Sequence, residues 1–192
     1  MTQPAKRPAS YADVLAAPKH LIAEVIDGEL RVSPRPALPH TAAASALGEE
    51  LGPPFKRGKG GPGGWLILDE PELHLGNDIV VPDLAGWRVE RIGALGNEPF
   101  LITVPDWICE VLSPGTAKYD RTDKLRLYGR EQVGWAWLVD PLLRTLEALR
   151  WESGRWSLLG VWRDDALVRA EPFDAIELEL GVLWQHVDLA ER

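Results

Sequence analysis

Residues 107–112 read WICEVL, a run in which every side chain except that of Glu110 is apolar. An almost continuous apolar run of this length is typical of a β-strand that is covered on both faces. Residues 135–139, WAWLV, show the same pattern, and residues 119–130 between the two runs favour a helix. A buried strand, a helix and another buried strand in succession predict an α/β fold in which helices flank a mixed β-sheet.

Additional hairpins, strands and a helix are expected around this unit. Asp27-Gly28 predicts a β-hairpin over residues 21–32, because a two-residue turn needs positive φ. Residues 41–51 favour a helix that ends at Gly52-Pro53-Pro54, and residues 145–161 favour a final hairpin. The remaining expected segments are a short helix at 11–16, a mobile loop at 55–64, strands at 65–68, 73–75, 79–81 and 84–87, and a strand or short helix within 176–189.

Length and composition indicate one compact domain over residues 1–192, with a loose N-terminal arm over residues 1–20. Hydrophobic residues make up 45% of the chain and charged residues 26%, the balance of a globular protein. No apolar run approaches the ~20 residues that a membrane-spanning helix needs, and the N-terminus lacks the apolar segment of a secretory signal. The single cysteine, Cys109, excludes an internal disulfide and a cysteine-built zinc site. We therefore expect a cytoplasmic protein.

The chain is acidic, with 21 Lys and Arg residues against 29 Asp and Glu residues and a formal net charge of −8. A protein that binds nucleic acid usually carries a basic surface, because contacts with phosphates supply most of its non-specific affinity. The acidity therefore argues against tight, unaided binding to DNA. It excludes neither a local basic groove nor an acidic site that binds metal ions.

Glu110 is the most informative residue, because its neighbours in the strand are all apolar. Burying a lone carboxylate costs several kcal/mol or forces the group to take up a proton. Glu110 therefore needs a compensating partner. Three remain open: an Arg or Lys in a buried ion pair, a set of backbone donors, or a metal ion.

Asp83 is the second candidate, since it follows the expected strand at residues 79–81 and the proline at position 82. Proline removes a donor of the β-ladder and favours a break there, so Pro-Asp alone more often marks a turn. A second carboxylate, Glu110, lies on a buried strand downstream. Two carboxylates from adjacent strands, with water and phosphate in the other positions, suit Mg²⁺.

Lys124 is the third candidate. Asp120, Lys124 and Tyr128 follow one another at intervals of four residues and so lie close to one face of the expected helix. From there Lys124 could orient a water molecule or balance the charge of a scissile phosphate. The alternative is a solvated Asp120–Lys124 pair with Asp120 as the N-cap, which stabilises a helix by only a few tenths of a kcal/mol.

Other candidates rest on weaker patterns. Glu24 could be a further acidic ligand, but an exposed charge on a strand is the more common situation. His40 could approach the site from the first long helix, or it is simply the residue at which that helix begins. The glycine-rich loop carries Lys56, Arg57 and Lys59, which could contact a nucleic-acid backbone or remain solvated.

These motifs together resemble the Uma family of putative bacterial restriction endonucleases. The resemblance spans residues 24–141 and continues weakly beyond them. It is carried by Ile26-Asp27-Gly28-Glu29-Leu30, His40, Pro82-Asp83, Pro105-Asp106, Glu110-Val111-Leu112-Ser113-Pro114, Tyr119-Asp120-Arg121, Lys124, Leu127-Tyr128 and Trp137-Leu138-Val139-Asp140-Pro141.

The family in turn is similar to the PD-(D/E)XK nuclease superfamily, which implies a restriction-endonuclease-like mixed sheet flanked by helices. The resemblance implies that Asp83, Glu110 and Lys124 are catalytic, and that Asp83, Glu110 and the backbone carbonyl of Val111 hold Mg²⁺ or Mn²⁺. Glu24, His40, Asp120 and Tyr128 are accessory candidates. The expected reaction is hydrolysis of phosphodiester bonds, with DNA as the expected polymer.

The sequence departs from the superfamily pattern at one position. The pattern has a lysine two residues after the glutamate, where this chain has Leu112. The resemblance to the Uma family implies that Lys124 of the following helix supplies the lysine instead. The alternative function is a catalytically inactive nuclease-fold module for dimerisation or nucleic-acid docking. A homodimer is expected, since a small nuclease needs two sites to cut both strands of a duplex.

Overall fold

A six-stranded mixed sheet organises residues 7–187, the part of the chain that the computed structural model describes. Its strand order is β10-β9-β8-β7-β6-β3; β7 and β8 run parallel, and the other neighbouring pairs run antiparallel. The strands are β3 (Trp65–Asp69), β6 (Leu84–Arg88), β7 (Trp107–Val111), β8 (Trp135–Asp140), β9 (Thr145–Glu152) and β10 (Arg155–Arg163). The predicted mixed α/β fold is confirmed.

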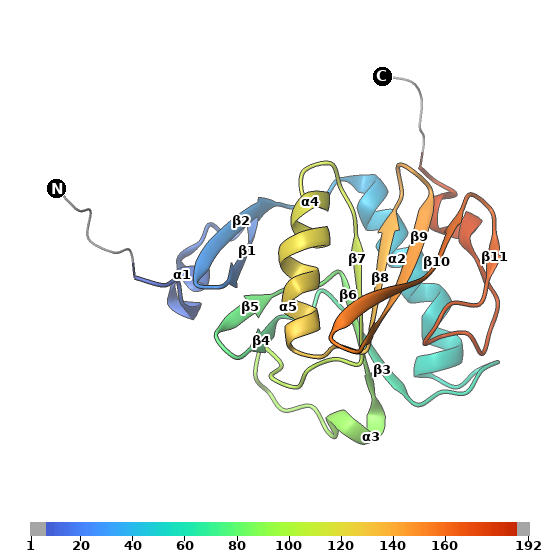
Figure 1. The fold of residues 1–192 in the computed structure, drawn as a ribbon, viewed down its shortest axis with the longest axis horizontal. Helices are drawn as coiled ribbons and strands as arrows, with labels where there is room; N and C mark the ends of the chain where they lie inside the picture. Colours follow the sequence, from blue (N-terminus) through green and yellow to red (C-terminus); the bar gives the residue numbers. More distant parts are fainter. Residues whose placement is uncertain (1–6, 188–192) are drawn as a thin grey trace.

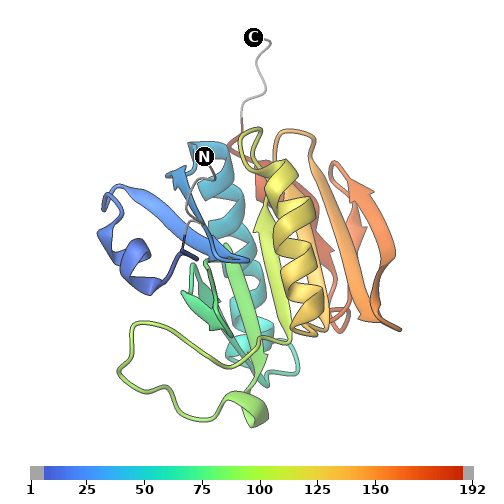
Figure 2. The same ribbon diagram turned by 60° about the vertical axis from the view of Figure 1, so that its left-hand side comes forward.

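Helices cover both faces of this sheet (Figures 1 and 2). On one face lies α2 (Leu38–Leu51); on the other lies a helical segment made of α4 (Ala117–Tyr119), the π-helical turn η2 (Asp120–Lys124) and α5 (Leu125–Arg130). An apolar core lies on each face of the large sheet, and alternate residues of β7 contribute to both. Trp107, Cys109 and Val111 pack on the α2 side, and Ile108 packs on the α5 side. By the same alternation Glu110 lies on the α5 side.

A smaller sheet with the order β2-β1-β5-β4 lies beside the large one (Figure 1). Its strands are β1 (Leu21–Ile26), β2 (Glu29–Pro34), β4 (Leu73–Leu75) and β5 (Asp78–Val80). The predicted hairpin is confirmed, with φ of 51° at Asp27 and 74° at Gly28. Residues 81–83 carry the chain from β5 directly into β6, so they join the two sheets.

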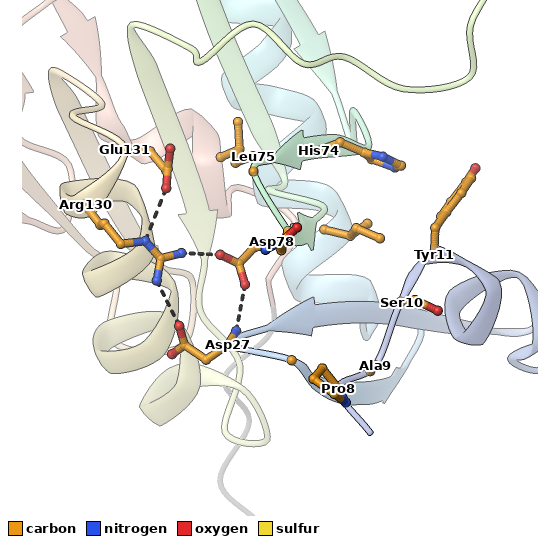
Figure 3. Close-up of a pocket in the computed structure, with 14 residues that line it drawn as sticks. Pro8, Ala9, Ser10, Tyr11, Asp27, His74, Leu75, Asp78, Arg130 and Glu131 are labelled. Carbon is orange, nitrogen blue, oxygen red and sulfur yellow. Dashed lines mark hydrogen bonds and ion pairs between the residues drawn. The ribbon is translucent and has the colours of Figure 1, made fainter. Parts of the chain in front are cut away.

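An ion-pair cluster attaches the hairpin turn to α5 (Figure 3). Asp78 accepts a hydrogen bond of 2.7 Å from the backbone N–H of Asp27. Arg130 of α5 binds Asp27 at 2.8 Å and also pairs with Asp78. The small sheet and the helix over the large sheet are therefore held in a defined relative position.

The α-helix α2 ends at Leu51 with Gly52 as its C-cap, as Gly52-Pro53-Pro54 predicts, but the loop expected after it does not begin there. The chain continues through one π-helical turn, η1 (Gly52–Lys56), closed by a 3.0 Å bond from the N–H of Arg57 to the carbonyl of Gly52. Prolines cannot donate the ordinary i→i−4 bond, and the wider turn needs no such donor from them. Phe55, expected in a loop, is consequently buried in the core.

The predicted helix over residues 119–130 is confirmed in outline, but its first part is the π-helical turn η2 rather than regular α-helix. In an α-helix, residues four apart are rotated by roughly 40°. A π-helical turn winds less per residue, which offsets this drift. Asp120, Lys124 and Tyr128 are therefore all buried on the side that faces the sheet.

The other elements agree with the sequence in type. The short helix α1 (Tyr11–Ala16) and the tail elements are present; the tail contains both a strand and a short helix, and positions 188–189 of its predicted segment lie outside the described residues. The backbone of Ala9 in the expected arm donates a 2.7 Å bond to Gly28. Elements that complete the fold are α3 (Val89–Ile92), β11 (Leu167–Val168), β12 (Leu178–Glu179) and the 3₁₀ helix η3 (Leu180–Trp184). Within residues 7–187, no helix has the length and hydrophobicity needed to cross a membrane.

At Gly129, α5 lies close to the β9–β10 hairpin. A Cβ atom at this position would lie 2.5 Å from the ring of Trp151, and that ring is packed against Trp156. Although alanine is better than glycine in a helix by about 1 kcal/mol, we expect Gly129→Ala to lower the free energy of unfolding by about 1–3 kcal/mol. Urea denaturation measures this change.

The control is the same substitution in a Trp151→Leu background, where the clashing ring is absent. There Gly129→Ala should be neutral or stabilising. An equal loss of stability in both backgrounds would mean that the contact with Trp151 is not the cause.

Candidate active site

The structure brings Asp83, Glu110 and Lys124 to the wall of one cavity of about 520 Å³. Each comes from a different element: Asp83 from the link between the sheets, Glu110 from β7 and Lys124 from η2. We call this space the hairpin cavity, because residues 31–36 of the β1–β2 hairpin and its continuation line its other side. The predicted convergence of two acids and an amine is thus present in the fold.

Lys124 is buried and uses its ammonium group to join several elements. Its Nζ donates to Glu110 Oε2 at 3.0 Å and to the carbonyl of Val81 at 3.2 Å, and it lies 3.1 Å from Glu24 Oε1. Asp120 Oδ1 is 3.9 Å away. An ammonium group has three donors, so these contacts satisfy it. The alternative of a solvated Asp120–Lys124 pair is wrong, since both side chains are about 95% buried.

Glu110 is held through both carboxylate oxygens. Oε1 accepts a 2.6 Å bond from the hydroxyl of Tyr128, and Oε2 accepts the bond from Lys124. Burial raises the pKa of Glu110 well above its usual range, and the ammonium of Lys124 opposes this shift. Of the partners left open by the sequence, a lysine ion pair is therefore present, and a tyrosine hydroxyl adds to it.

Asp83 is fixed at the side of β7. Its Oδ2 accepts a 2.6 Å bond from the backbone N–H of Val111, and its Oδ1 lies 3.1 Å from Nε2 of His40. His40 comes from the first turn of α2, so it does more than mark the start of that helix. The bond to Val111 places Asp83 next to the residue that follows Glu110.

Glu24 is only 4% exposed, so the interpretation of an exposed strand charge is wrong. It lies on β1, a strand with neighbours on both sides, and its Oε1 accepts a 2.9 Å bond from the N–H of Val81. Val81 thus binds Glu24 through its N–H and Lys124 through its carbonyl. The sequence could not reveal this, because alternation alone does not say which face of a short sheet another sheet covers.

The cluster carries more negative than positive charge. The carboxyl groups of Glu24, Glu110 and Asp120 lie within 3.9 Å of the single ammonium of Lys124, and Asp83 is close enough to Glu110 to raise its pKa. Burial by itself would lower the pKa of Lys124, but the attraction of Glu110 and Glu24 raises it above its usual value. Burial raises the pKa of Asp120 to about 6. A further cation would offset this excess of charge.

The donor set fits a hard divalent cation. Among residues 7–187 no group of three His, Cys, Asp or Glu side chains forms a metal cage made by the protein alone. Mg²⁺ does not need one, since it is bound by one or two carboxylates together with water and substrate phosphates. Asp83 and Glu110, two carboxyl groups on the wall of one cavity, match that requirement.

Of the three basic residues of the glycine-rich loop, two line a cavity and one does not. Lys56 and Arg57 line a second space of about 450 Å³, which we call the helix cavity because α2 forms much of its wall. Lys56 also donates a 2.8 Å bond to the carbonyl of Ile67. Lys59 lies outside the walls of both cavities.

Two residues of the hairpin cavity were not identified from the sequence. The guanidinium of Arg31 lies 4.8 Å from the ring centre of Tyr119, and the hydroxyl of Tyr119 is buried without a hydrogen-bond partner among the described residues. Tyr119 was included in the family motifs, but nothing in the sequence connects it to Arg31. Their contact depends on how the hairpin folds over the start of the helix.

A larger hollow of about 850 Å³ lies elsewhere, between residues 8–11, the hairpin turn and the end of α5 (Figure 3). Its charged side chains Asp27, Asp78, Arg130 and Glu131 pair with one another. None of the predicted site residues lines it. We therefore place the candidate site at the hairpin cavity.

Comparison with known proteins agrees with this fold. The profile of the Uma2 family, described as "Putative restriction endonuclease", matches residues 10–182. The crystal structure of a putative nuclease belonging to DUF820 from Anabaena variabilis is similar, with a TM-score of 0.70, 23% sequence identity, and coverage of 93% of this chain and 98% of that one. At this identity the likeness shows the fold alone. None of the curated proteins matches the chain.

The raised pKa of Asp120 makes stability depend on pH. Its pKa of about 6 exceeds the usual value of about 4, so between these values the folded state binds a proton that the unfolded state lacks. The resulting stabilisation is complete below about pH 4 and is lost as the pH rises through about 6. Relative to Asp120→Asn, the wild-type protein should lose about 3 kcal/mol between about pH 4 and pH 7.

Urea denaturation in the presence of EDTA, repeated across this pH range, checks the prediction. Asp164→Asn, which changes an exposed carboxylate, is the control and should follow the wild-type curve. Parallel pH profiles for the wild type and Asp120→Asn would contradict the role given to burial.

Proposed function

The chain belongs to the Uma2 family of putative restriction endonucleases, and from this membership we propose that it is a metal-dependent endonuclease that hydrolyses phosphodiester bonds in DNA. One observation carries the proposal: Asp83, Glu110 and Lys124 border the same cavity, although 41 residues separate the first from the last. Two carboxylates and an amine at one site are the set that the resemblance to the PD-(D/E)XK superfamily implies.

In this proposal Asp83, Glu110 and the backbone carbonyl of Val111 hold Mg²⁺ or Mn²⁺. Such an ion supplies Lewis-acid polarisation of the scissile phosphate and lowers the pKa of a bound water. The protein contributes a fixed geometry. Asp83 is held by the Val111 N–H and by His40, and Glu110 is held by Tyr128 and Lys124.

Lys124 takes the role of the lysine in the superfamily pattern. That pattern would place the lysine at position 112, but Leu112 is buried among apolar side chains on the α5 side of the sheet. Lys124 reaches Glu110 from η2 instead, and its raised pKa keeps it charged at neutral pH. A charged ammonium beside the reacting phosphate stabilises the negative charge that develops there.

The accessory residues have positioning roles in this proposal. Tyr128 and Glu24 hold Glu110 and Lys124 in place, and Asp120 adds a further carboxyl group 3.9 Å from the ammonium. His40 orients Asp83. A homodimer would present two such sites and allow both strands of a duplex to be cut.

A second candidate function is a nuclease-fold module that binds or dimerises without catalysis. One observation favours it: both carboxylate oxygens of Glu110 already accept hydrogen bonds, from Tyr128 and Lys124. In such a module Lys124 serves as the permanent counter-ion of Glu110. The two candidates differ in whether a divalent cation binds, which can be measured directly.

Loss of either carboxylate should stop cleavage. We expect Asp83→Asn and Glu110→Gln each to lower the rate of Mg²⁺- or Mn²⁺-dependent plasmid cleavage by at least about 100-fold, because each removes charge that holds the ion and its water. Gel analysis of plasmid and single-stranded DNA measures the rate, and EDTA should abolish it.

Glu90→Gln is the matched control, since Glu90 is an exposed residue of α3 away from the cavity, and it should retain wild-type activity. Circular dichroism must show that the inactive variants are folded. Undiminished cleavage by both folded variants would end the assignment of these residues.

Cation binding should stabilise the fold. A ligand present at 100 times its dissociation constant adds about 2.7 kcal/mol to the free energy of unfolding if it binds only the folded state. We expect millimolar Mn²⁺ to raise the melting temperature of the wild type and to leave that of Asp83→Asn nearly unchanged. A flat response of the wild type would instead support the module without catalysis.

A further inference from the structure

The hairpin cavity and the helix cavity lie on either side of the His40–Asp83 pair. Both have Pro36, His40 and Asp83 in their walls, so they meet at these residues. Their volumes, about 520 Å³ and about 450 Å³, each fall in the range of about 300–1,000 Å³ that holds one small organic ligand. Asp83 is therefore at the junction of two spaces of similar size.

Each cavity has cationic side chains in its wall, and the helix cavity also has the carboxylates of Glu49, Asp69 and Glu70. The hairpin cavity has Arg31 and Arg35 in its wall, and the helix cavity has Lys56 and Arg57. Of the carboxylates of the candidate site, Asp83 lies at the junction between these two pairs of cations. Phosphates on both sides of a central acidic site would each meet positive charge.

The wall of the helix cavity allows close approach. Its α2 side includes the small residues Ala44 and Ser45, which leave room beside the helix. Glu49 also lines this wall, and Asp69 Oδ1 lies 3.0 Å from the position that a Cβ on Gly48 would take. Arg57 folds back toward this surface, with a guanidinium nitrogen 3.9 Å from the position that a Cβ on Gly52 would take. A chain lying along α2 would therefore meet the Arg57 guanidinium at the end of the helix cavity where η1 begins.

We propose that a single strand of DNA lies across both cavities, with Arg31 and Arg35 binding its phosphates on one side of Asp83 and Lys56 and Arg57 binding them on the other. The proposal rests on the nuclease function given above and names its substrate path. Each cavity suits one nucleotide and not the width of a duplex. The net charge of −8 further disfavours a broad electrostatic surface for a duplex.

Glu70 partly closes this path. Arg35 lies 4.0 Å from Glu70, so an ion pair links a residue of the hairpin cavity to a residue of the helix cavity across their junction. The side chains are 62% and 47% exposed, and exposed pairs of this kind contribute about 0–1 kcal/mol. A phosphate can therefore replace Glu70 as the partner of Arg35 at little cost.

Binding to the wild-type protein in EDTA tests the path without cleavage. The probe is a fluorescein-labelled single-stranded oligodeoxynucleotide of about eight nucleotides, a length typical of single-strand sites, compared with its duplex. Anisotropy titrations over a range of NaCl concentrations give the salt dependence. Arg31→Ala and Arg57→Ala should each reduce the slope of log K against log [NaCl] by about 0.7, the value for one phosphate contact on a single strand.

Two matched variants sharpen the test. Lys59→Ala removes a cation of the same glycine-rich loop but outside both cavities, so its slope should equal that of the wild type. Glu70→Gln should bind the single strand more tightly than the wild type, because it frees Arg35 and removes a repelling charge. Tighter binding of the duplex, or equal losses for Lys59→Ala and Arg57→Ala, would overturn the proposal.

The binding experiment tests the DNA path, and the cleavage experiment tests the nuclease function, so each proposal can fail without the other. Single-strand binding with the expected slopes, but no cleavage with Mg²⁺ or Mn²⁺, would support the path and refute the nuclease. Cleavage that needs Asp83 and Glu110 while binding ignores Arg31 and Arg57 would refute the path and leave the nuclease intact.

Discussion

The buried ammonium group of Lys124 joins the two sheets of this protein. It contacts Glu24 on the small sheet, Glu110 on the large sheet and the carbonyl of Val81 in the link between them. A charge buried in this way is tolerated only when it is paired and fully hydrogen-bonded. The same contacts that join the sheets therefore build the candidate site, and site geometry and fold stability depend on one another.

The position of the lysine follows from the helix that carries it. A lysine at position 112 would place a charge within the apolar core. The chain has Leu112 there, and its side chain is part of that core. The π-helical turn η2 aligns Asp120 and Lys124 with Tyr128 on the face toward the sheet. Irregular helical turns of this kind are frequent at functional sites, because they aim side chains that a regular helix would direct elsewhere.

The sequence predicted much of the fold and the central residues of the candidate site, since these rest on local patterns. Apolar runs mark the buried strands, Asp27-Gly28 marks the hairpin, and a lone glutamate in an apolar strand demands a partner wherever that strand lies. The wrong predictions concern which distant segments pack against one another. Glu24 and Asp120 look like surface charges because their local neighbourhoods cannot reveal the segments that cover them, which are far away in the chain.

By itself the sequence determined the type and order of the main elements, the need of Glu110 for a counter-charge, and the resemblance to the Uma family, because each of these is encoded in short stretches or in their order. Tertiary structure alone decided that Lys124 is that counter-charge, that Glu24 also contacts Lys124, that His40 pairs with Asp83, and that two cavities meet at Asp83. These relations depend on the angle and spacing between two sheets and a helix. Contacts between distant segments set that geometry, and no local pattern records it.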